Sequence, residues 1–388
     1  MRGLASFILL FLLLSGAGWA VAQTAFFTSS AAPTYAFNIS FQLITGAVAV
    51  PIERVDLFMQ ASQAERPFTV EAIRVSQADG QLRADVDVDP VDAALPPFAE
   101  VRFWWELHTT AGETIVVPEE TFVYEDDRFT WRVLEAGDVI VHWTGNDADL
   151  GQLAADIVAE SRQTLDAILP QTAVSPLNLY IYPSTADLRS GLRLAGRDWQ
   201  AGHTDPDLGV LLVTAVNPLT AAADLAQTIP HELTHLRLYQ LKSGRALPLW
   251  YEEGMALLAE GALGDGDLLT TAVADKTTLP VRDLCLAFPE EEGAVDLALA
   301  QSASLLAYIR RQFGDQALRQ LGAIYLAGTG CEAGLTQTLD MPVSDLQADW
   351  LATLAPESGW RNFFAQNGLW LLLVIASFGF TALLLRRQ

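Results

Sequence analysis

The sequence predicts an all-β sandwich, an α+β domain after it and a C-terminal transmembrane helix. Residues 33–132 contain short segments in which apolar and polar residues alternate, and this period of two is typical of half-buried strands. After residue 136, strand-like and helix-like segments are mixed, which is typical of an α+β architecture. Residues 369–385 contain no charged residue, as expected of a helix that crosses a bilayer.

The alternation in the first region is clearest in residues 35–41, and it recurs in residues 54–60, 68–75, 82–88, 101–109 and 114–117. Turn-forming residues such as Gly80 and Gly112 separate these segments. Short strands at this spacing predict an immunoglobulin- or fibronectin-like sandwich, which we assign to residues 23–135. We expect Trp104, Trp105 and Trp131 to lie in a core or at a domain junction rather than to bind a ligand.

The second region, residues 136–355, begins with a mixture of predicted strands and helices. Strands are expected at residues 139–143, 177–182 and 209–214, and helices at residues 147–169 and 185–194. A longer helix would then begin with Thr228 as its cap and Pro230 in its first turn, and it would end near Gly244. Another helix is predicted at about residues 249–262. His108 and His142 lack metal-ligand spacing, so we expect both to be structural.

His231 and His235 form, with Glu232, the pattern H-E-x-x-H. On a helix, two residues four apart project from one face, so both imidazoles can reach one Zn²⁺ at about 2.0–2.1 Å. Glu232 is beside them and can take a proton from water at the metal. Glu253, eighteen positions after His235, would be the third ligand and would come from the next helix. The fourth position would stay open for water and substrate, which is typical of catalytic zinc sites.

These residues, followed by the sequence Pro-Leu-Trp-Tyr-Glu-Glu-Gly-Met-Ala at 248–256, resemble the gluzincin metallopeptidases, specifically the peptidase MA-like domains. The resemblance implies an α+β, thermolysin-like metallopeptidase domain over roughly residues 137–355. It also implies that Glu253, which directly precedes a Gly, is the third zinc ligand rather than Glu252. In thermolysin-like domains an edge strand borders the cleft and pairs with extended substrate. Residues 209–213 are our candidate for that strand.

The resemblance extends to Ala300-Gln301-Ser302, which is similar to a Tyr-Ala-Gln-Ser stretch on a later helix of the same domains. Here Leu299 stands where a Tyr is common, so a residue that assists at the transition state is not identified. Tyr251, Tyr239 and His203 are candidates for that role, although a loop histidine without a catalytic role is the simpler interpretation of His203. Glu252 either hydrogen-bonds a ligand or lies in solvent.

The two ends of the chain predict an exported, membrane-anchored protein. Residues 1–22 have a basic start, an apolar run and Ala20-Val21-Ala22, as in a signal peptide; an uncleaved anchor is the alternative. A linker at residues 356–368 would lead to the transmembrane helix at 369–385, for which a buried core helix is the alternative. The arginines in residues 386–388 would stay in the cytoplasm. These features predict a single-pass protein of the cell membrane with its N-terminal ectodomain outside.

Composition narrows the choice of partners. The chain has 47 acidic and 23 basic residues and a net charge of −24, which argues against nucleic-acid binding because that requires a basic surface. Cys285 and Cys331 are the two cysteines of the chain, and both lie in the exported part. They would form a disulfide there or remain two separate buried thiols. The sequence makes no prediction of the oligomeric state.

The functional prediction is a zinc metallopeptidase that binds one Zn²⁺ and hydrolyses peptide or protein substrates, with Glu232 as the general base. Two other classes remain open. One is a peptidase-like binding module that has lost its activity, to which Leu299 gives some weight. The other is a surface adhesion or scaffold protein in which the β-sandwich is the working part.

Overall fold

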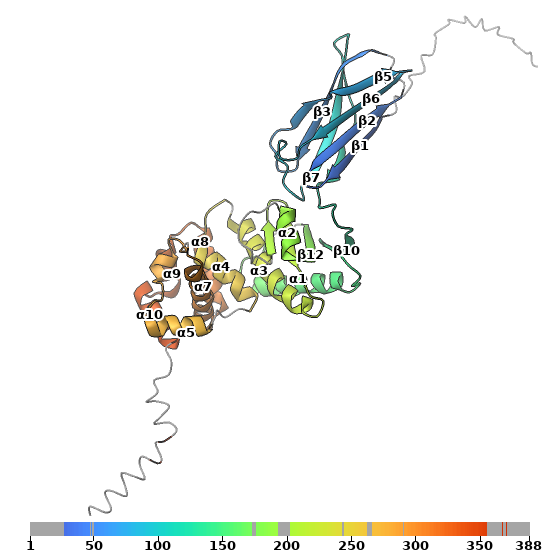
Figure 1. Cartoon of the computed structure of the whole chain (residues 1–388). Helices are drawn as coiled ribbons and strands as arrows, with labels where there is room; N and C mark the ends of the chain where they lie inside the picture. Colours follow the sequence, from blue (N-terminus) through green and yellow to red (C-terminus); the bar gives the residue numbers. More distant parts are fainter. Residues whose placement is uncertain are drawn as a thin grey trace, which may run out of the picture. The chain divides into compact units, whose positions relative to one another are not determined.

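The structure of the chain is a computed structural model, and it describes residues 27–46, 48, 50–172, 176–192, 202–242, 244–261, 266–289, 291–354, 367 and 370. The chain divides into two compact units, Met1–Arg128 and Phe129–Gln388. The first unit is built of strands and the second contains a sheet together with all the helices that Figure 1 labels.

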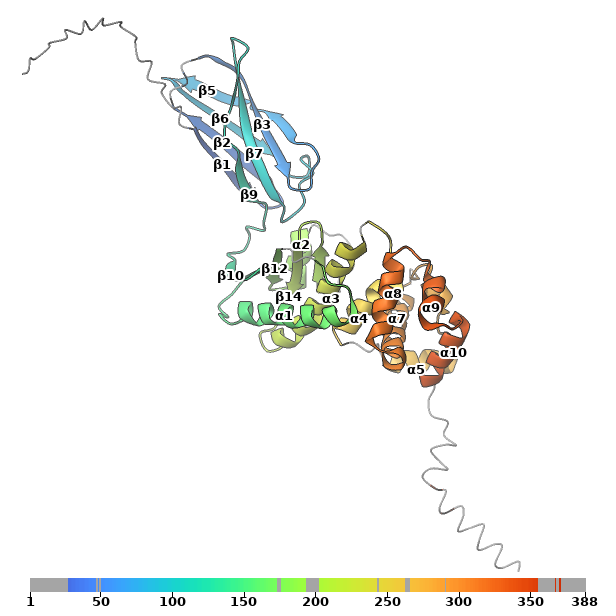
Figure 2. The ribbon, with the colours of Figure 1, turned by 180° about the vertical axis from the view of Figure 1, so that it is seen from behind.

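The first unit consists of two antiparallel sheets. One has the strand order β1-β2-β6-β5, and the other has the order β4-β3-β7-β8, with β9 also pairing with β7. The strands are β1 (Phe27–Thr34), β2 (Asn38–Thr45), β3 (Ile52–Ala61), β4 (Phe68–Glu71), β5 (Arg74–Ala78), β6 (Gln81–Val88), β7 (Glu100–Thr109), β8 (Thr114–Val116) and β9 (Glu120–Val123). Figures 1 and 2 show the two sheets lying against each other.

Alternation along the strands explains this packing. In β2 and β7 every second side chain is buried, because successive residues of a strand point to opposite faces. Phe41 and Phe103 meet between the sheets with ring centroids 5.0 Å apart. Trp105 is buried and donates a hydrogen bond to Ser29, whereas its neighbour Trp104 stacks on Phe58. The predicted sheet-rich region is therefore present, and its tryptophans are packing residues.

The second unit has a five-stranded sheet with the order β10-β11-β12-β14-β13. Its strands are β10 (Arg132–Ala136), β11 (Val139–Trp143), β12 (Leu177–Tyr182), β13 (Gly202–Asp205) and β14 (Val210–Thr214). The three central strands are parallel, and both edge strands are antiparallel to their neighbours. The expected edge strand at 209–213 corresponds to β14, which is an interior strand. The edge is β13, and His203 lies in it rather than in a loop.

Ten helices complete the described part of this unit: α1 (Leu150–Ile168), α2 (Thr185–Leu192), α3 (Ala221–Lys242), α4 (Leu249–Ala259), α5 (Gly266–Asp275), α6 (Val281–Leu284), α7 (Glu292–Phe313), α8 (Asp315–Leu326), α9 (Cys331–Leu339) and α10 (Val343–Leu354). Helix α3 begins earlier than predicted, so Pro230 lies inside it. Thr220 rather than Thr228 starts the helix, since its carbonyl accepts hydrogen bonds from Ala223 and Asp224.

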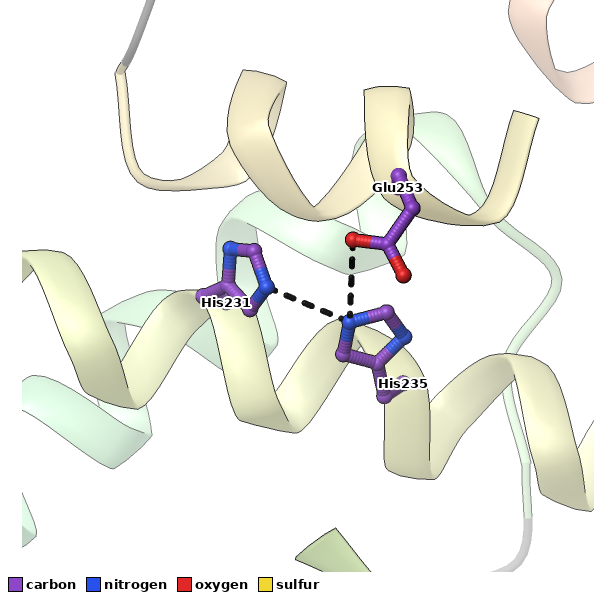
Figure 3. Close-up of side chains that lie close together, drawn as sticks. All are labelled: His231, His235 and Glu253. Carbon is purple, nitrogen blue, oxygen red and sulfur yellow. Dashed lines mark hydrogen bonds and ion pairs between the residues drawn. The ribbon is translucent and has the colours of Figure 1, made fainter. Parts of the chain in front are cut away.

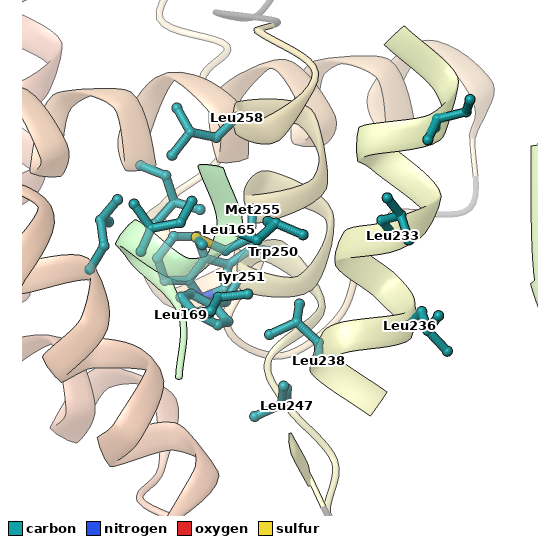
Figure 4. Close-up of a cluster of buried hydrophobic side chains, with 14 of the residues drawn as sticks. Leu165, Leu169, Leu233, Leu236, Leu238, Leu247, Trp250, Tyr251, Met255 and Leu258 are labelled. Atoms are coloured by element: carbon teal, nitrogen blue, oxygen red, sulfur yellow. The ribbon is translucent and has the colours of Figure 1, made fainter. Parts of the chain in front are cut away.

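The core of the second unit joins the sheet to the helices. Leu233 and Leu236 on α3 and Trp250, Tyr251 and Met255 on α4 are all buried in it. Figure 4 shows Trp250, Tyr251 and Met255 of α4 close to Leu165 and Leu169, and the same core includes residues of the later helices. This packing fixes α4 against α3, and it therefore sets which side chains of the two helices face each other.

The predicted C-terminal transmembrane helix, and with it the single-pass location in the cell membrane, is wrong. Within the described residues no helix is both long enough and apolar enough to cross a membrane. The longest described helices, α3 and α7, have 22 residues each, but both carry charged side chains, which are costly in hydrocarbon. Apart from Asn367 and Trp370, residues 355–388 lie outside the described residues, as does the predicted signal peptide at residues 1–22.

Candidate metal centre

His231 and His235 lie one turn apart on α3 and project from the same face of the helix (Figure 3). The apolar residues Leu225, Ile229 and Leu233 form a buried stripe on α3, so this helix is held by the core while the two imidazoles stay partly exposed. The Nε2 atoms of the two rings are 3.2 Å apart. The Nε2 atoms of both rings are therefore directed at the same small space.

Glu253 reaches this point from α4. One of its carboxylate oxygens lies 3.9 Å from Nε2 of His235, and the ligand atoms of the three residues lie within 4.8 Å of one another. The neighbouring Gly254 allows α4 to approach α7 closely: a Cβ there would lie 2.7 Å from Leu306 and 2.9 Å from the carbonyl oxygen of Ser302. This close packing sets the position of Glu253.

The three side chains fit a metal ion. Two nitrogen ligands at about 2.0–2.1 Å from a tetrahedral ion are roughly 3.3 Å apart, which is close to the observed separation of the two imidazoles. Burial, followed by the charges of His231 and Lys242, lowers the pKa of His235 to about 4. The neutral imidazole that results is the form that binds a metal. In the described part of the chain this is the cluster of histidine and carboxylate side chains that could hold an ion.

Glu260 joins the site from the C-terminal end of α4, and the sequence analysis missed it. Its carboxylate lies 3.3 Å from Nδ1 of His231, which leaves Nε2 of that ring for the metal. Burial by itself would lower the pKa of His231, but the hydrogen bond with Glu260 and the charges of the nearby glutamates raise it overall. The spacing in the sequence could have identified Glu260. It follows Glu253 by seven residues, or about two helical turns, so both side chains lie on one face of the helix.

Glu232, the predicted base, is buried, with 8% of its surface exposed, and it lines the cavity together with His231, His235 and Glu253. Thr204 on β13 donates a hydrogen bond to its Oε2 over 2.5 Å. Burial is the largest influence on Glu232 and raises the pKa of its carboxyl, while Thr204 and His231 act in the opposite direction. A raised pKa is suited to a group that must accept a proton and then release it near neutral pH.

The site opens into a cavity of about 900 Å³. Residues of α3, α4 and β13 supply its polar side, where the histidines and glutamates lie. The rest of the lining is apolar and comes from α4, α7 and the segment between α6 and α7: Leu249, Leu257, Ala287, Phe288, Pro289, Val295 and Leu299. The cavity therefore joins a candidate metal centre to a surface that can bury apolar groups.

Leu299 lines this cavity from α7, at the position where the resemblance implies a Tyr. Two tyrosines that could replace it lie elsewhere. Tyr251 is completely buried in the core, and burial raises the pKa of its phenol. Tyr239 donates a hydrogen bond to Asp207 and does not line the cavity. Neither tyrosine lines the cavity, so neither could assist a reaction in it.

The two other candidates for supporting roles also differ from expectation. His203 is on the cavity wall, but successive residues of a strand point to opposite faces, and its neighbour Thr204 is the one directed at Glu232. Burial lowers the pKa of His203, so its ring is neutral. Glu252 forms an ion pair with Lys242 at 3.3 Å instead of contacting a ligand.

A disulfide joins Cys285, which directly follows α6, to Cys331 at the start of α9. The first of these residues lies two positions before the cavity-lining segment at 287–289. Trp250 donates a hydrogen bond to the sulfur of Cys331, over 3.0 Å. The disulfide thus ties the apolar side of the cavity to the base of α4.

Comparison with known proteins gives one informative match. The model of the peptidase MA superfamily matches residues 161–356, which is half of the chain and includes all the side chains of the site. No curated protein matches the chain.

Two matching solved structures are distant. A polysaccharide deacetylase from Bacillus cereus is 11% identical, with 45% of this chain and 57% of that protein covered and a TM-score of 0.21. A purple acid phosphatase from yellow lupin (Lupinus luteus) seeds is 11% identical, with coverages of 48% and 34% and a TM-score of 0.20. The chain thus spans little more than half of the first protein and about a third of the second, and at these TM-scores neither match bears on its function.

Proposed function

The chain belongs to the peptidase MA superfamily, and we propose that it is a zinc-dependent metallopeptidase that hydrolyses peptide bonds in the cavity between α3, α4 and α7. The observation that carries this proposal is the convergence of His231, His235 and Glu253 beside the buried carboxylate of Glu232. Three nitrogen and oxygen ligands with a fourth position left for solvent are typical of catalytic rather than structural zinc sites.

His231, His235 and Glu253 would hold the zinc ion. When bound, zinc supplies a Lewis acid that polarises a carbonyl group and makes water a stronger acid. Glu260 would keep the His231 ring oriented through its Nδ1 atom. Glu232 would accept the proton of the attacking water and later deliver it to the leaving nitrogen, so that the amine departs as a neutral group.

The edge strand β13 offers a place for an extended substrate. Gly202, His203 and Thr204 line the cavity, and β13 pairs with β14 along one edge. A peptide could add to its other edge by backbone hydrogen bonds, which are independent of side-chain sequence. Side-chain preference would then come from the apolar part of the cavity.

The test compares the full-length chain with its Glu232→Gln variant. Both are assayed for bound zinc and for digestion of a mixed peptide library. We expect one zinc ion in each protein, and hydrolysis by the wild type only, because Gln retains the shape of the side chain but cannot accept the proton. Full activity of Glu232→Gln would exclude Glu232 as the base, and absence of zinc from the wild type would contradict the whole proposal.

Leu299 favours a second candidate, a peptidase-like module that binds peptides without cleaving them. This residue places an aliphatic side chain on the cavity wall, at the position where the family resemblance implies a Tyr. The same experiment distinguishes the two functions. Stoichiometric zinc and peptide binding without turnover would favour the binding module.

A further inference from the structure

The carboxylate of Glu232 is held by a second element besides its own helix. Gly202 and Thr204 are two residues apart on β13, so both face the same side of the sheet. Thr204 hydrogen-bonds the Glu232 carboxylate, and the space that a side chain at position 202 would need is occupied by the same carboxylate. Thr204 Oγ1 lies 2.5 Å from Oε2 of Glu232 and 3.1 Å from the backbone oxygen of the same residue. The Thr204 hydroxyl therefore lies close to both the side-chain carboxylate and the backbone carbonyl of Glu232.

Gly202 provides the space on the other side of the carboxylate. A Cβ atom at this position would lie 2.6 Å from Oε1 and 2.8 Å from Cγ of Glu232, and 2.7 Å from a methyl group of Thr228. Real Cβ atoms do not approach so closely, so any side chain at position 202 would displace the carboxylate. The two carboxylate oxygens thus meet two different residues of the same short strand.

The pairing of β13 fixes this arrangement in the fold. Gly202 pairs with Val213 and Thr204 pairs with Leu211. Both partners lie on β14 and are completely buried. The strand therefore cannot shift without disturbing the core, while its other edge borders the cavity.

We infer that β13 is a positioning element for the base: Thr204 holds the Glu232 carboxylate by a hydrogen bond, and Gly202 leaves the room that this carboxylate occupies. The inference rests on the proposed function, since it assigns residues to that reaction. It also gives β13 two roles. A peptide that adds to the free edge of β13 would pair with the same strand that positions the Glu232 carboxylate. Thr204 and Gly202 act through Glu232 and are positioning residues rather than catalytic ones.

The kinetic test uses the zinc-loaded full-length chain and a quenched fluorogenic peptide drawn from the library. Thr204→Val removes the hydroxyl but keeps the shape of the side chain. We expect kcat to fall about tenfold, as for the loss of one hydrogen bond to an ionised group, with KM and zinc content unchanged. Thr204→Ser restores the hydroxyl and should return kcat to within about twofold of the wild type. Gly202→Ala should lower kcat at least as much as Thr204→Val.

Thr164→Val is the matched control, since Thr164 is an exposed residue of α1 whose hydroxyl donates to the backbone oxygen of Glu160, and it does not line the cavity. Its kcat should equal that of the wild type. The inference is overturned if Thr204→Val keeps the wild-type kcat, or if Thr204→Ser is as impaired as Thr204→Val, which would mean that the methyl group rather than the hydroxyl matters.

A second measurement does not depend on activity. The midpoints of thermal unfolding are compared for the wild type, Thr204→Val, Glu232→Ala and the double variant. A direct contact predicts that the double variant shifts the midpoint by less than the sum of the two single shifts. Additive shifts would overturn the inference. If the wild type cleaves no peptide the proposed function fails, whereas this cycle still decides whether Thr204 holds Glu232.

Discussion

Glu260 contacts His231 in the candidate metal centre, and the sequence analysis did not identify it. It is the partner of the His231 Nδ1 atom, and it directly follows α4, the helix that carries Glu253. A carboxylate in this position fixes the ring orientation and makes the other ring nitrogen a better ligand. Metal affinity should therefore depend on Glu260, although Glu260 would act through His231 and not as a ligand itself.

We expect Glu260→Gln to weaken zinc binding by about 10- to 100-fold, the range typical of such outer partners of metal-bound histidines. Affinity is measured by competition with a chromophoric chelator. Glu252→Gln is the matched control: the same change on the same helix, but at a residue paired with Lys242 outside the cavity lining. Equal affinities for the two variants would show that Glu260 does not support His231.

His142 gives the second prediction at this scale. Burial lowers the pKa of His142, with a smaller opposing effect from its contact with Asn178, and its ring stacks on Tyr180. Above pH ~6.5 the folded and unfolded chains both carry the neutral ring. Below this pH the unfolded chain binds a proton that the folded chain takes up only at lower pH, so the free energy of unfolding falls.

The measurement is denaturant unfolding of the metal-free chain between pH 7 and pH 5. His142→Gln should lose stability at pH 7, because the stacking is lost, but its free energy of unfolding should fall less steeply on acidification than that of the wild type. Metal-free protein is used so that release of an ion from the site does not add to the slope. Identical slopes would show that His142 titrates normally in the folded chain.

At the scale of elements, the contact between α4 and α7 determines where Glu253, the proposed third ligand, lies. Gly254→Ala would place a methyl group 2.7 Å from Leu306 and 2.9 Å from the carbonyl oxygen of Ser302, so α4 must shift and carry Glu253 with it. We expect a loss of roughly 1–3 kcal/mol in stability, as for other overpacked sites, together with weaker zinc binding. Unfolding and chelator competition measure the two effects.

Gly266→Ala is the control for that substitution, because a Cβ at the start of α5 would meet no atom within 4 Å. It should be neutral or slightly stabilising. If Gly254→Ala bound zinc as tightly as Gly266→Ala, the close packing of α4 on α7 would not control Glu253.

The disulfide between Cys285 and Cys331 is the second feature at this scale, and it links α6 to α9. Cys285 and Cys331 close a loop with a sequence separation of 46 residues, for which chain entropy suggests about 4 kcal/mol of stabilisation. The double variant Cys285→Ser, Cys331→Ser should therefore unfold at a markedly lower denaturant concentration, without reducing agent. The wild type treated with reductant should unfold at a denaturant concentration close to that of the double variant. A variant as stable as the wild type would show that core packing alone holds α6 and α9 together.

These elements also show what the sequence could and could not predict. The spacing of His231 and His235 and the apolar stripe on α3 are local features, so the sequence predicted the helix and the face that the two histidines share. The edge strand β13 was missed because Gly-His-Thr-Asp has no apolar alternation and becomes a strand only by pairing with β14. The same holds for Thr204, whose role exists only because α3 packs beside β13.

The start of α3 was misplaced for a related reason. Thr228 followed by Pro230 has the pattern of a helix N-terminus, since Pro is favoured in the first turn. In the structure, Thr228 donates instead to the carbonyl of Asp224 within the helix, and Pro230 is buried. Tertiary packing of Leu225 and Ile229 compensates for the hydrogen bond that Pro230 cannot donate.

At the scale of the whole molecule, every residue of the proposed site belongs to one compact unit. The ligands, Glu232, Glu260 and β13 all lie in Phe129–Gln388, whereas Met1–Arg128 has its own core between two sheets. Separate cores allow the two units to unfold as separate cooperative transitions. A metal that binds only the folded second unit should stabilise that unit alone.

Removal of metal therefore tests both the site and the division into units. In scanning calorimetry of the zinc-loaded chain we expect two transitions, and a chelator should lower the midpoint of one while leaving the other unchanged. At a free zinc concentration about 1,000 times Kd, the stabilisation is roughly 4 kcal/mol, enough to shift a domain of this size by several degrees. His231→Ala, His235→Ala should abolish the chelator effect, because without these two ligands the ion is no longer held. The transition that the chelator moves should be the one that the disulfide double variant also moves, since both changes act in the second unit. If chelation shifted both transitions equally, the two units would unfold together, and if it shifted neither, the three side chains would not form a metal site.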